Sequence, residues 1–428
     1  MKELFKSVII KILTIEARLV LRKYHPNVVL VTGSVGKTST KDALYATLSQ
    51  KYYVRKSEKS FNSDIGTPLT VLGVPNGWNN PLLWLRNCIS GLFLILVRSP
   101  YPEWLIIEVG ADRPGDISYS LKWLRPTMVV ATRFPNMPVH VEFYDSPEAV
   151  QQEELSPLRW LHPGGVAVLN ADDELVANVA LPEEVERVLY GLSDADVHAS
   201  KIHTLVTHGM PHGTSFDVSY KGERAHVSIE GIAGNAHVYA VLGGIAGAVA
   251  LGVPLVAAAE GAAAHVGPAG RMRLLAGKNG TVLLEDSYNA SPIAVEEALR
   301  TLASLPHTGR RSAMLGDMIE LGPYSVAEHE KVGRMAAHAA DVLVTVGVRA
   351  RSIAASAEAA GMQRANIFQF DRAVDAAEHV QTIIAEGDVV LIKGSQSMRM
   401  ERASKLLMAH PEDAKHVLPR QDAEWLAR

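Results

Sequence analysis

A run of residues suited to binding phosphate lies near the N-terminus. Gly33, Gly36, Lys37 and Thr38 occur in the order G-x-x-G-K-T, directly after the apolar run NVVLVT. Glycine lets the backbone approach phosphate oxygens, lysine neutralises charge between the β- and γ-phosphates, and the threonine hydroxyl can bind Mg²⁺. The run predicts a triphosphate-binding loop between a buried strand and a helix. An accidental glycine-rich turn is the alternative, since the spacing is shorter than the commoner G-x-x-x-x-G-K-[ST].

Several other polar residues follow apolar runs that read as strands. Glu108 lies near the end of EWLIIEV, Asp317 follows RSAMLG, and Lys393 lies in DVVLIKG. Ligands bind where parallel strands end, so these side chains are candidates for a site. A solvated carboxylate at a strand end is the alternative for Glu108.

Two further segments carry polar side chains whose role is open. His140 is a single histidine in PVHVEF, and such a residue is often only a hydrogen-bonding support. Asp286 and Asn289 lie in DSYNASP, between an apolar run and Pro292, which can start a helix. They are candidates for ligand contacts, but they could equally be turn and N-cap residues.

The elements that must position these residues alternate between apolar runs and helical stretches. Continuous apolar runs such as TMVVAT and GVAVLN predict parallel strands that are covered on both faces. We expect an α/β fold, with a P-loop-type central domain containing a mostly parallel sheet and a C-terminal Rossmann-like α/β domain. The Gly and Pro residues of HVGPAGRM indicate a hinge. The predicted division is an N-terminal amphipathic helix at 1–26, a central domain at 27–267 and a C-terminal domain at 268–428.

Composition excludes some functions. A net charge of -4 gives no reason to expect a nucleic-acid partner, so phosphate-bearing ligands must be held locally. Cys88 is the single cysteine, which excludes an intramolecular disulfide and a cysteine-based zinc cluster and fits a cytoplasmic location.

The first two dozen residues are both apolar and basic. Charges interrupt them every few positions, so they predict an amphipathic helix and not a membrane span. The helix either packs on the protein's own body or gives a weak membrane association at the surface. A second apolar run, CISGLFLILV at 88–97, is also too short to span, and the two could form one patch.

The loop, in the form T-G-S-x-G-K-T, resembles that of the Mur ligases and their relatives. Further segments are similar to family motifs in the same order: SFNSDIGTPLTVLG, IIEVGADRPGDI, VLNADD, GRM, LEDSYNASP, LGDMIELG and LIKGSQSMRME. DSYNASP and LGDMIELG most resemble the branch that adds D-alanyl-D-alanine to a UDP-muramoyl tripeptide. The resemblance runs from about Val28 to the C-terminus.

The resemblance implies an ATP-dependent amide ligase that works through an acyl phosphate, with ATP and Mg²⁺ as cofactors. It implies a nucleotide-sugar peptide and an amino acid or dipeptide as substrates. Lys37, Glu108 and His140 would be catalytic, and Thr38, Glu108 and His140 would bind the metal. Asp317 and Lys393 would bind the amine. The residues expected to contact the nucleotide are Gly33, Ser34, Gly36, Lys37, Thr38, Ser39, Asn62, Arg271, Asp286 and Asn289.

Two features depart from the family pattern. Only about 27 residues precede the loop, where that branch usually has a UDP-sugar domain, so we expect this domain to be lacking. Gln152 stands where relatives often have a lysine, which is carbamylated in several Mur ligases, so a second metal would be held differently, weakly, or through Glu153 or Glu154. The alternatives are a Mur-like ligase for another carboxylate and amine, or a catalytically silent nucleotide-binding subunit.

Overall fold

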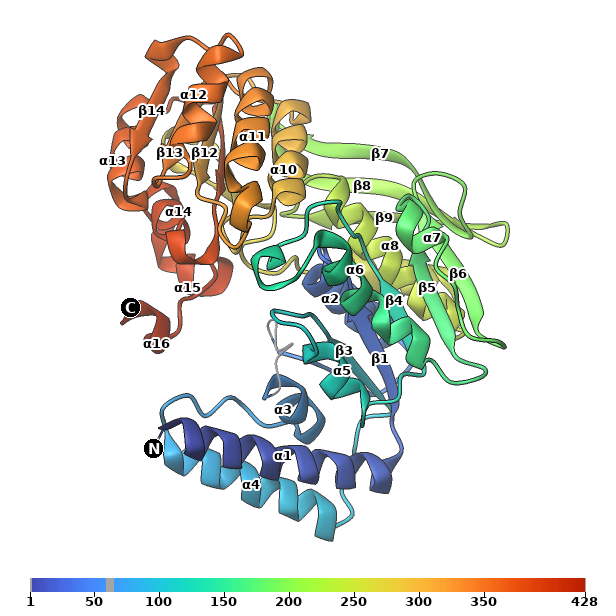
Figure 1. Cartoon of the computed structure of the whole chain (residues 1–428). Helices are drawn as coiled ribbons and strands as arrows, with labels where there is room; N and C mark the ends of the chain where they lie inside the picture. The colour runs from blue at the N-terminus through green and yellow to red at the C-terminus, as the bar shows by residue number, and fades with distance from the viewer. Residues whose placement is uncertain (1, 59–64, 428) are drawn as a thin grey trace.

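The computed structural model describes residues 2–58 and 65–427, with side chains described from Ser7 onward. Two β-sheets, each packed against helices, form two units that lie one above the other in Figure 1. Most strand pairs in both sheets are parallel, which confirms the predicted α/β fold. The predicted domain division after residue 267 stays a prediction; the segment 264–272 there joins the last helix before it to the first strand after it.

The first sheet has nine strands in the order β2-β3-β1-β4-β5-β6-β7-β8-β9. The strands from β2 to β7 pair in parallel, and the last two pairs are antiparallel. Its strands are β1 (Asn27–Thr32), β2 (Val54–Lys56), β3 (Trp104–Glu108), β4 (Met128–Ala131), β5 (Val166–Asn170), β6 (Glu186–Gly191), β7 (Val197–Thr207), β8 (Met210–Tyr220) and β9 (Glu223–Glu230).

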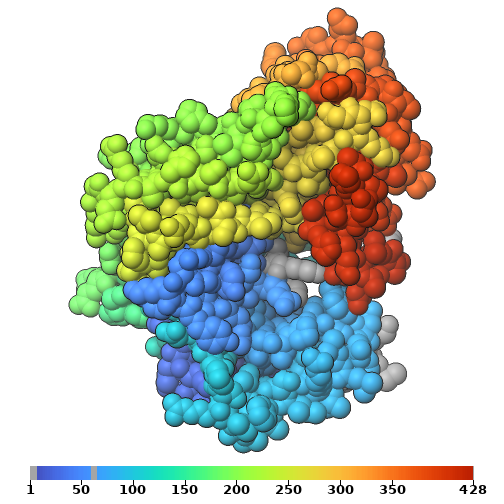
Figure 2. All heavy atoms as spheres, turned by 180° about the vertical axis from the view of Figure 1, so that it is seen from behind, coloured from blue at the N-terminus to red at the C-terminus, as the bar shows by residue number. Residues whose placement is uncertain are grey.

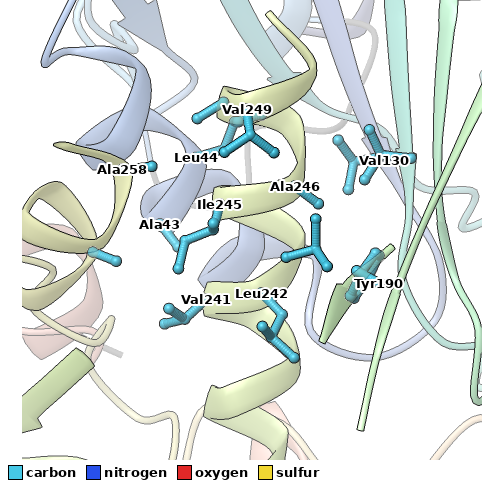
Figure 3. Close-up of a cluster of buried hydrophobic side chains, with 14 of the residues drawn as sticks. Ala43, Leu44, Val130, Tyr190, Val241, Leu242, Ile245, Ala246, Val249 and Ala258 are labelled. Carbon is cyan, nitrogen blue, oxygen red and sulfur yellow. The ribbon is translucent and has the colours of Figure 1, made fainter. Parts of the chain in front are cut away.

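Helices cover both faces of the parallel part of this sheet. Val29 and Val31 of β1 face one core, and Val28 and Leu30 face the other, which explains the unbroken apolar run. The helices of this unit are α1 (Lys2–Tyr24), α2 (Lys37–Leu48), α3 (Gly66–Leu72), α4 (Pro81–Leu96), α5 (Asp116–Leu121), α6 (Pro147–Leu155), α7 (Glu174–Ala177), α8 (Asn235–Ala250) and α9 (Leu255–Ala263). Figure 3 shows side chains of α8 filling the space between α2 and the sheet.

The antiparallel end of the sheet was not predicted from the sequence. β7, β8 and β9 are joined by two-residue turns, His208-Gly209 and Lys221-Gly222. All four turn residues have positive φ, as two-residue hairpin turns with the twist of the strands require. The two X-Gly pairs between alternating runs are the signal that identifies these hairpins.

The second sheet has six strands in the order β10-β11-β15-β12-β13-β14. All neighbours pair in parallel except β10 and β11. The strands are β10 (Arg273–Ala276), β11 (Val282–Asp286), β12 (Arg311–Gly316), β13 (Val342–Val346), β14 (Ile367–Phe370) and β15 (Val389–Lys393). The helices are α10 (Pro292–Ser304), α11 (Ser325–Ala339), α12 (Arg351–Ala359), α13 (Ala373–Ile383), α14 (Glu401–Leu407), α15 (Ala414–Val417) and α16 (Ala423–Leu426).

The predicted N-terminal helix is present as α1, and one face of it packs on the protein's own body. Leu13 and Val20 are buried in the same core as Val28 and Leu30 of β1. α1 lies beside α4, where a Cβ on Gly91 would fall 2.2 Å from Oε2 of Glu16. In the described part of the chain, no helix is long and apolar enough to cross a bilayer.

Glu16 makes the stability of this helix pair depend on pH. The residue is 9% exposed, and burial raises the pKa of its carboxyl from 4.5 to about 7. The folded state therefore holds a proton that the unfolded state releases, so stability falls as pH rises from about 4.5 to about 7 and stays lower above it. We predict that Glu16→Gln removes this loss and stabilises the protein at pH 8 by about 1–2 kcal/mol.

Urea unfolding of both proteins at pH 5 and pH 8 measures this effect. Glu183→Gln, which changes an exposed carboxylate, is the control and should unfold like the wild type. Equal stability of wild type and Glu16→Gln at pH 8 would contradict the assignment.

Candidate active site

The glycine loop lies between β1 and α2, as predicted. Gly33 and Gly36 have φ angles of 128° and 89°. A Cβ on Gly33 would lie 2.1 Å from Oγ1 of Thr132, so only glycine fits there. The chain then turns directly into α2, whose first-turn N–H groups point out of the helix end and favour an anion.

Lys37 extends back along this loop. Its ammonium group donates to the carbonyl oxygen of Gly33 and lies 3.3 Å from Oε1 of Glu154. Oε2 of Glu154 accepts a hydrogen bond from the Ser34 hydroxyl at 2.5 Å. A carboxylate from α6 therefore balances the charge of the loop lysine, and anionic phosphates would compete with it for that lysine.

Glu108 lies next to the loop because β3 pairs in parallel with β1. The register sets Glu108 opposite Val31, two residues before Gly33. The carboxylate is 2% exposed and accepts a hydrogen bond from Oγ1 of Thr38 at 2.9 Å. The buried ammonium group of Lys41 lies 3.6 Å from it. Glu108 is therefore a buried carboxylate fixed against α2, and the alternative of a solvated strand end is wrong.

His140 joins the two units. Its backbone has a φ of 64°, and its Nδ1 lies 2.7 Å from Oε2 of Glu320 in the second unit. Its Nε2 lies 3.5 Å from Asp112. Burial lowers the pKa of His140, but Glu320 and Asp112 outweigh burial and raise it above the ordinary value. The ring is thus held between carboxylates of both units.

Asp286 and Lys393 form a buried pair at the ends of neighbouring strands. The β11–β15 register sets them opposite each other, and Nζ of Lys393 lies 2.6 Å from Oδ2 of Asp286. The same ammonium group donates to the carbonyl oxygen of Asn289 at 2.9 Å. Burial lowers the pKa of Lys393, and Asp286 opposes that shift. Ser291 is the N-cap of α10, so Asp286 and Asn289 do not cap this helix.

Arg271 follows the predicted hinge and stacks on an aromatic ring. Its guanidinium lies 4.2 Å from the centroid of Tyr288. Gly270, with a φ of 76°, permits this packing, because a Cβ there would lie 2.9 Å from Tyr288. The stack fixes a planar cation at the edge of the second unit.

These groups line one cavity of about 630 Å³ between the units. The predicted residues that the cavity brings together are Ser34, Gly36, Lys37, Thr38, Ser39, Glu108, His140, Arg271, Asp286, Asn289 and Lys393. Residues of the loop after β1 and Glu108 at the end of β3 line the cavity together with residues of the second unit. Strand ends from two sheets thus supply a single site.

Other predicted residues do not line the cavity. Asp317 is buried, and its Oδ1 accepts from the backbone N–H of Ala350 at 2.7 Å. Asn62 lies outside the described residues. Gln152 is exposed, whereas Glu153 accepts from the backbone N–H groups at the start of α5. Glu154 is the residue of that segment that reaches the loop.

The cavity also contains residues that the sequence did not single out. Asp112, Glu320 and Arg399 lie inside motifs that were recognised, so the motif segments were the available signal. Glu297 and Trp425 had no such signal, because only the packing of the two units brings them to the cavity. Among residues 2–58 and 65–427, no group of three or more His, Cys, Asp or Glu side chains is arranged to hold a metal ion.

Two family models match parts of the chain. The Mur ligase middle domain matches residues 31–81 and 91–248, which leaves α1 and the segment 82–90 of α4 unmatched. The Mur ligase glutamate ligase domain matches residues 270–396. The two matches include the loop, Glu108, Arg271, Asp286 and Lys393.

Individual relatives match almost the whole chain. The UDP-N-acetylmuramoyl-tripeptide–D-alanyl-D-alanine ligase of Mycobacterium tuberculosis is 31% identical over 89% of this chain and 72% of its own. The ligase of the same name from Bacillus subtilis is 26% identical over 92% and 79%. The crystal structure of the MurF ligase of Thermotoga maritima with ADP is 23% identical, with a TM-score of 0.74 over 95% of this chain and 84% of that one. The chain therefore belongs to the Mur ligase family.

Proposed function

We propose that the chain is an ATP-dependent amide ligase that adds D-alanyl-D-alanine to a UDP-muramoyl tripeptide in peptidoglycan precursor synthesis. One observation carries this proposal: the phosphate-type loop with Lys37, the Thr38–Glu108 pair and the second unit's Asp286–Lys393 pair line one cavity. The names of the Mycobacterium tuberculosis and Bacillus subtilis relatives support the choice of the two substrates.

In this proposal the loop binds the phosphates of ATP. The first-turn N–H groups of α2 and the ammonium group of Lys37 hold the terminal phosphates, with Gly33, Ser34, Gly36 and Ser39 shaping the loop. From the second unit, Arg271, Asp286 and Asn289 contact the nucleotide. These assignments, and that of Asn62, are proposals.

The Thr38–Glu108 pair fits a Mg²⁺ site. Mg²⁺ is usually held by one or two protein oxygens together with phosphate oxygens and water, so a hydroxyl and a carboxylate 2.9 Å apart suffice. The ion would neutralise charge on the transferring phosphoryl group. His140, the third predicted ligand, is paired with Glu320 in this arrangement, and we assign it first to the contact between the units.

The chemistry requires charge stabilisation and exclusion of water. Lys37 and the loop amides stabilise negative charge as the γ-phosphoryl passes to the acceptor carboxylate and the bond to the ADP oxygen breaks. The amine then attacks the acyl phosphate, and phosphate leaves as the amide forms. The second unit covers the site through His140–Glu320 and Arg133–Glu297 contacts, which limits hydrolysis of the intermediate. Lys393 is the candidate for amine binding on that side.

Substrate dependence tests the function directly. We predict phosphate release from ATP only when both a UDP-muramoyl tripeptide and D-alanyl-D-alanine are present. Omission of either substrate is the control. Release that needs a different acceptor or amine would overturn the substrate assignment, and ATP binding without release under any pair would indicate a silent subunit.

Lys37 is expected to act on catalysis more than on folding. Its side chain is surface-accessible at the cavity, and Lys37→Ala should lower the rate of phosphate release by about 10²- to 10³-fold, because one charge-stabilising donor is lost. Lys122→Ala, which removes an exposed lysine outside the cavity, should leave the rate unchanged. A rate for Lys37→Ala within twofold of wild type would rule out its role.

Glu108 is expected to set the response to Mg²⁺. Glu108→Gln keeps the shape of the side chain but removes the charge beside Thr38, so the Mg²⁺ concentration for half-maximal activity should rise at least about tenfold. A Mg²⁺ titration of phosphate release measures this, with Glu386→Gln as the exposed control. An unchanged Mg²⁺ requirement would place the ion elsewhere.

A further inference from the structure

α1 carries a second apolar row that the core does not use. Beside its buried row it exposes Val8, Ile12, Ile15 and Leu19, from 38% at Ile12 to 58% at Ile15. The spacing of four, three and four residues places these side chains on one side of the helix. From Ser7 onward, α1 therefore buries one apolar row and exposes another to solvent.

α4 repeats this pattern. It exposes Leu85, Ile89, Leu92 and Leu96 at the same spacing, from 50% at Leu92 to 72% at Leu96. Leu82 and Phe93 extend the row. Soluble monomers rarely expose a contiguous apolar row of this length unless something binds it.

The two rows form one face. α1 and α4 run in the same direction, side by side, at the end of the first unit in Figure 1. They touch at Glu16 and Gly91, and Nζ of Lys23 donates to carbonyl oxygens in the last turn of α4 and to that of Val97, the residue after the helix, at 2.8 Å. Successive residues of a helix are about 100° apart around its axis. Counted from the contact at Glu16 and Gly91, the exposed row of α1 and that of α4 therefore lie on the same side of the helix pair. Figure 2 shows α4, in light blue, at the lower end of the molecule.

Cations surround this face. Residues 1–24 and 80–98 contain eight Lys and Arg but two Asp and Glu, whereas the whole chain has a net charge of -4. Lys11, Arg18, Arg22, Arg86 and Arg98 are exposed, and no carboxylate of the described residues is recorded within 4.0 Å of them. Pairing of the face with a second copy of itself would bring these like charges together, whereas an anionic surface would attract them.

Most of the face lies outside the segments that match the family, although Leu92, Phe93 and Leu96 fall within the matched residues 91–248. α1 precedes the matched middle domain, and residues 82–90 of α4 interrupt it. Neither helix lines the cavity between the units. The proposed ligation therefore gives no reason for the exposed rows.

We propose that α1 and α4 form a membrane-binding face that lies flat on an anionic phospholipid bilayer. The two apolar rows enter the boundary between headgroups and acyl chains, and the flanking cations remain at the level of the phosphates. The described helices are too short or too polar to span, so the binding is peripheral.

Vesicle flotation of the full chain tests this proposal. We expect the protein to float with vesicles of equal phosphatidylglycerol and phosphatidylcholine. It should float poorly with phosphatidylcholine alone, or in about 1 M salt, because salt screens the attraction between the cations and the anionic lipid. Ile89→Gln with Leu92→Gln should lower the partition coefficient at least about tenfold. The matched control, Val256→Gln with Val348→Gln, changes exposed apolar residues elsewhere and should float like wild type.

Charge reversal provides a second variant that leaves the apolar rows intact. Arg18→Glu with Arg86→Glu should lower binding to the anionic vesicles at least about tenfold, whereas Arg334→Glu with Lys405→Glu should not. All variants should unfold at the wild-type temperature.

Three outcomes would overturn the proposal. The wild type could stay with the vesicle-free fraction at every lipid composition. The helix variants could float as well as wild type. The helix variants could also lose a concentration-dependent dimer that the wild type forms without lipid, while still floating with vesicles. That result would assign the face to contact with a second copy of the chain. None of these readouts depends on ligase activity.

Discussion

Parallel pairing of β1 with β3 is the constraint on which the site depends. Because Glu108 pairs with Val31, its carboxylate reaches the start of α2 and meets Thr38. Burial of both faces of β1 fixes this register, since a shift by one residue would turn apolar side chains of the two cores to the wrong sides. The position of the carboxylate beside the loop is therefore set by hydrophobic packing, not by the loop itself.

The second unit completes the cavity through ionic contacts. His140–Glu320 and Arg133–Glu297 join the units beside the cavity, and away from it Ala233 and Met210 of the first unit pack into the core of the second. Such polar contacts break at lower cost than an apolar interface, which suits a site that must open for substrates and close over an acyl phosphate. Buried pairing of Lys393 with Asp286 keeps the second unit's charges in place during that motion.

Short sequence patterns predicted the features that depend on neighbouring residues, but not the contacts that depend on how the two units pack. The unbroken apolar runs and the loop gave the parallel strands, and strand ends gave Glu108 and Lys393. The contacts of Glu320 and Glu297 could not be predicted, because they depend on how the units pack. Asp317 directly follows its strand as expected, yet its carboxylate accepts a hydrogen bond from the backbone N–H of Ala350, which no strand-end rule anticipates. The hairpins after β6 were missed although their X-Gly turns were readable.

Equilibrium binding of a non-hydrolysable ATP analogue, with and without Mg²⁺, tests the central claim most directly. Titration calorimetry of the folded full chain should show one site per chain, with Mg²⁺ increasing the affinity because the proposed ligands Thr38 and Glu108 would hold the ion beside the phosphates. No measurable binding by folded protein in the presence of Mg²⁺ would contradict the account, whatever acceptor or amine is supplied.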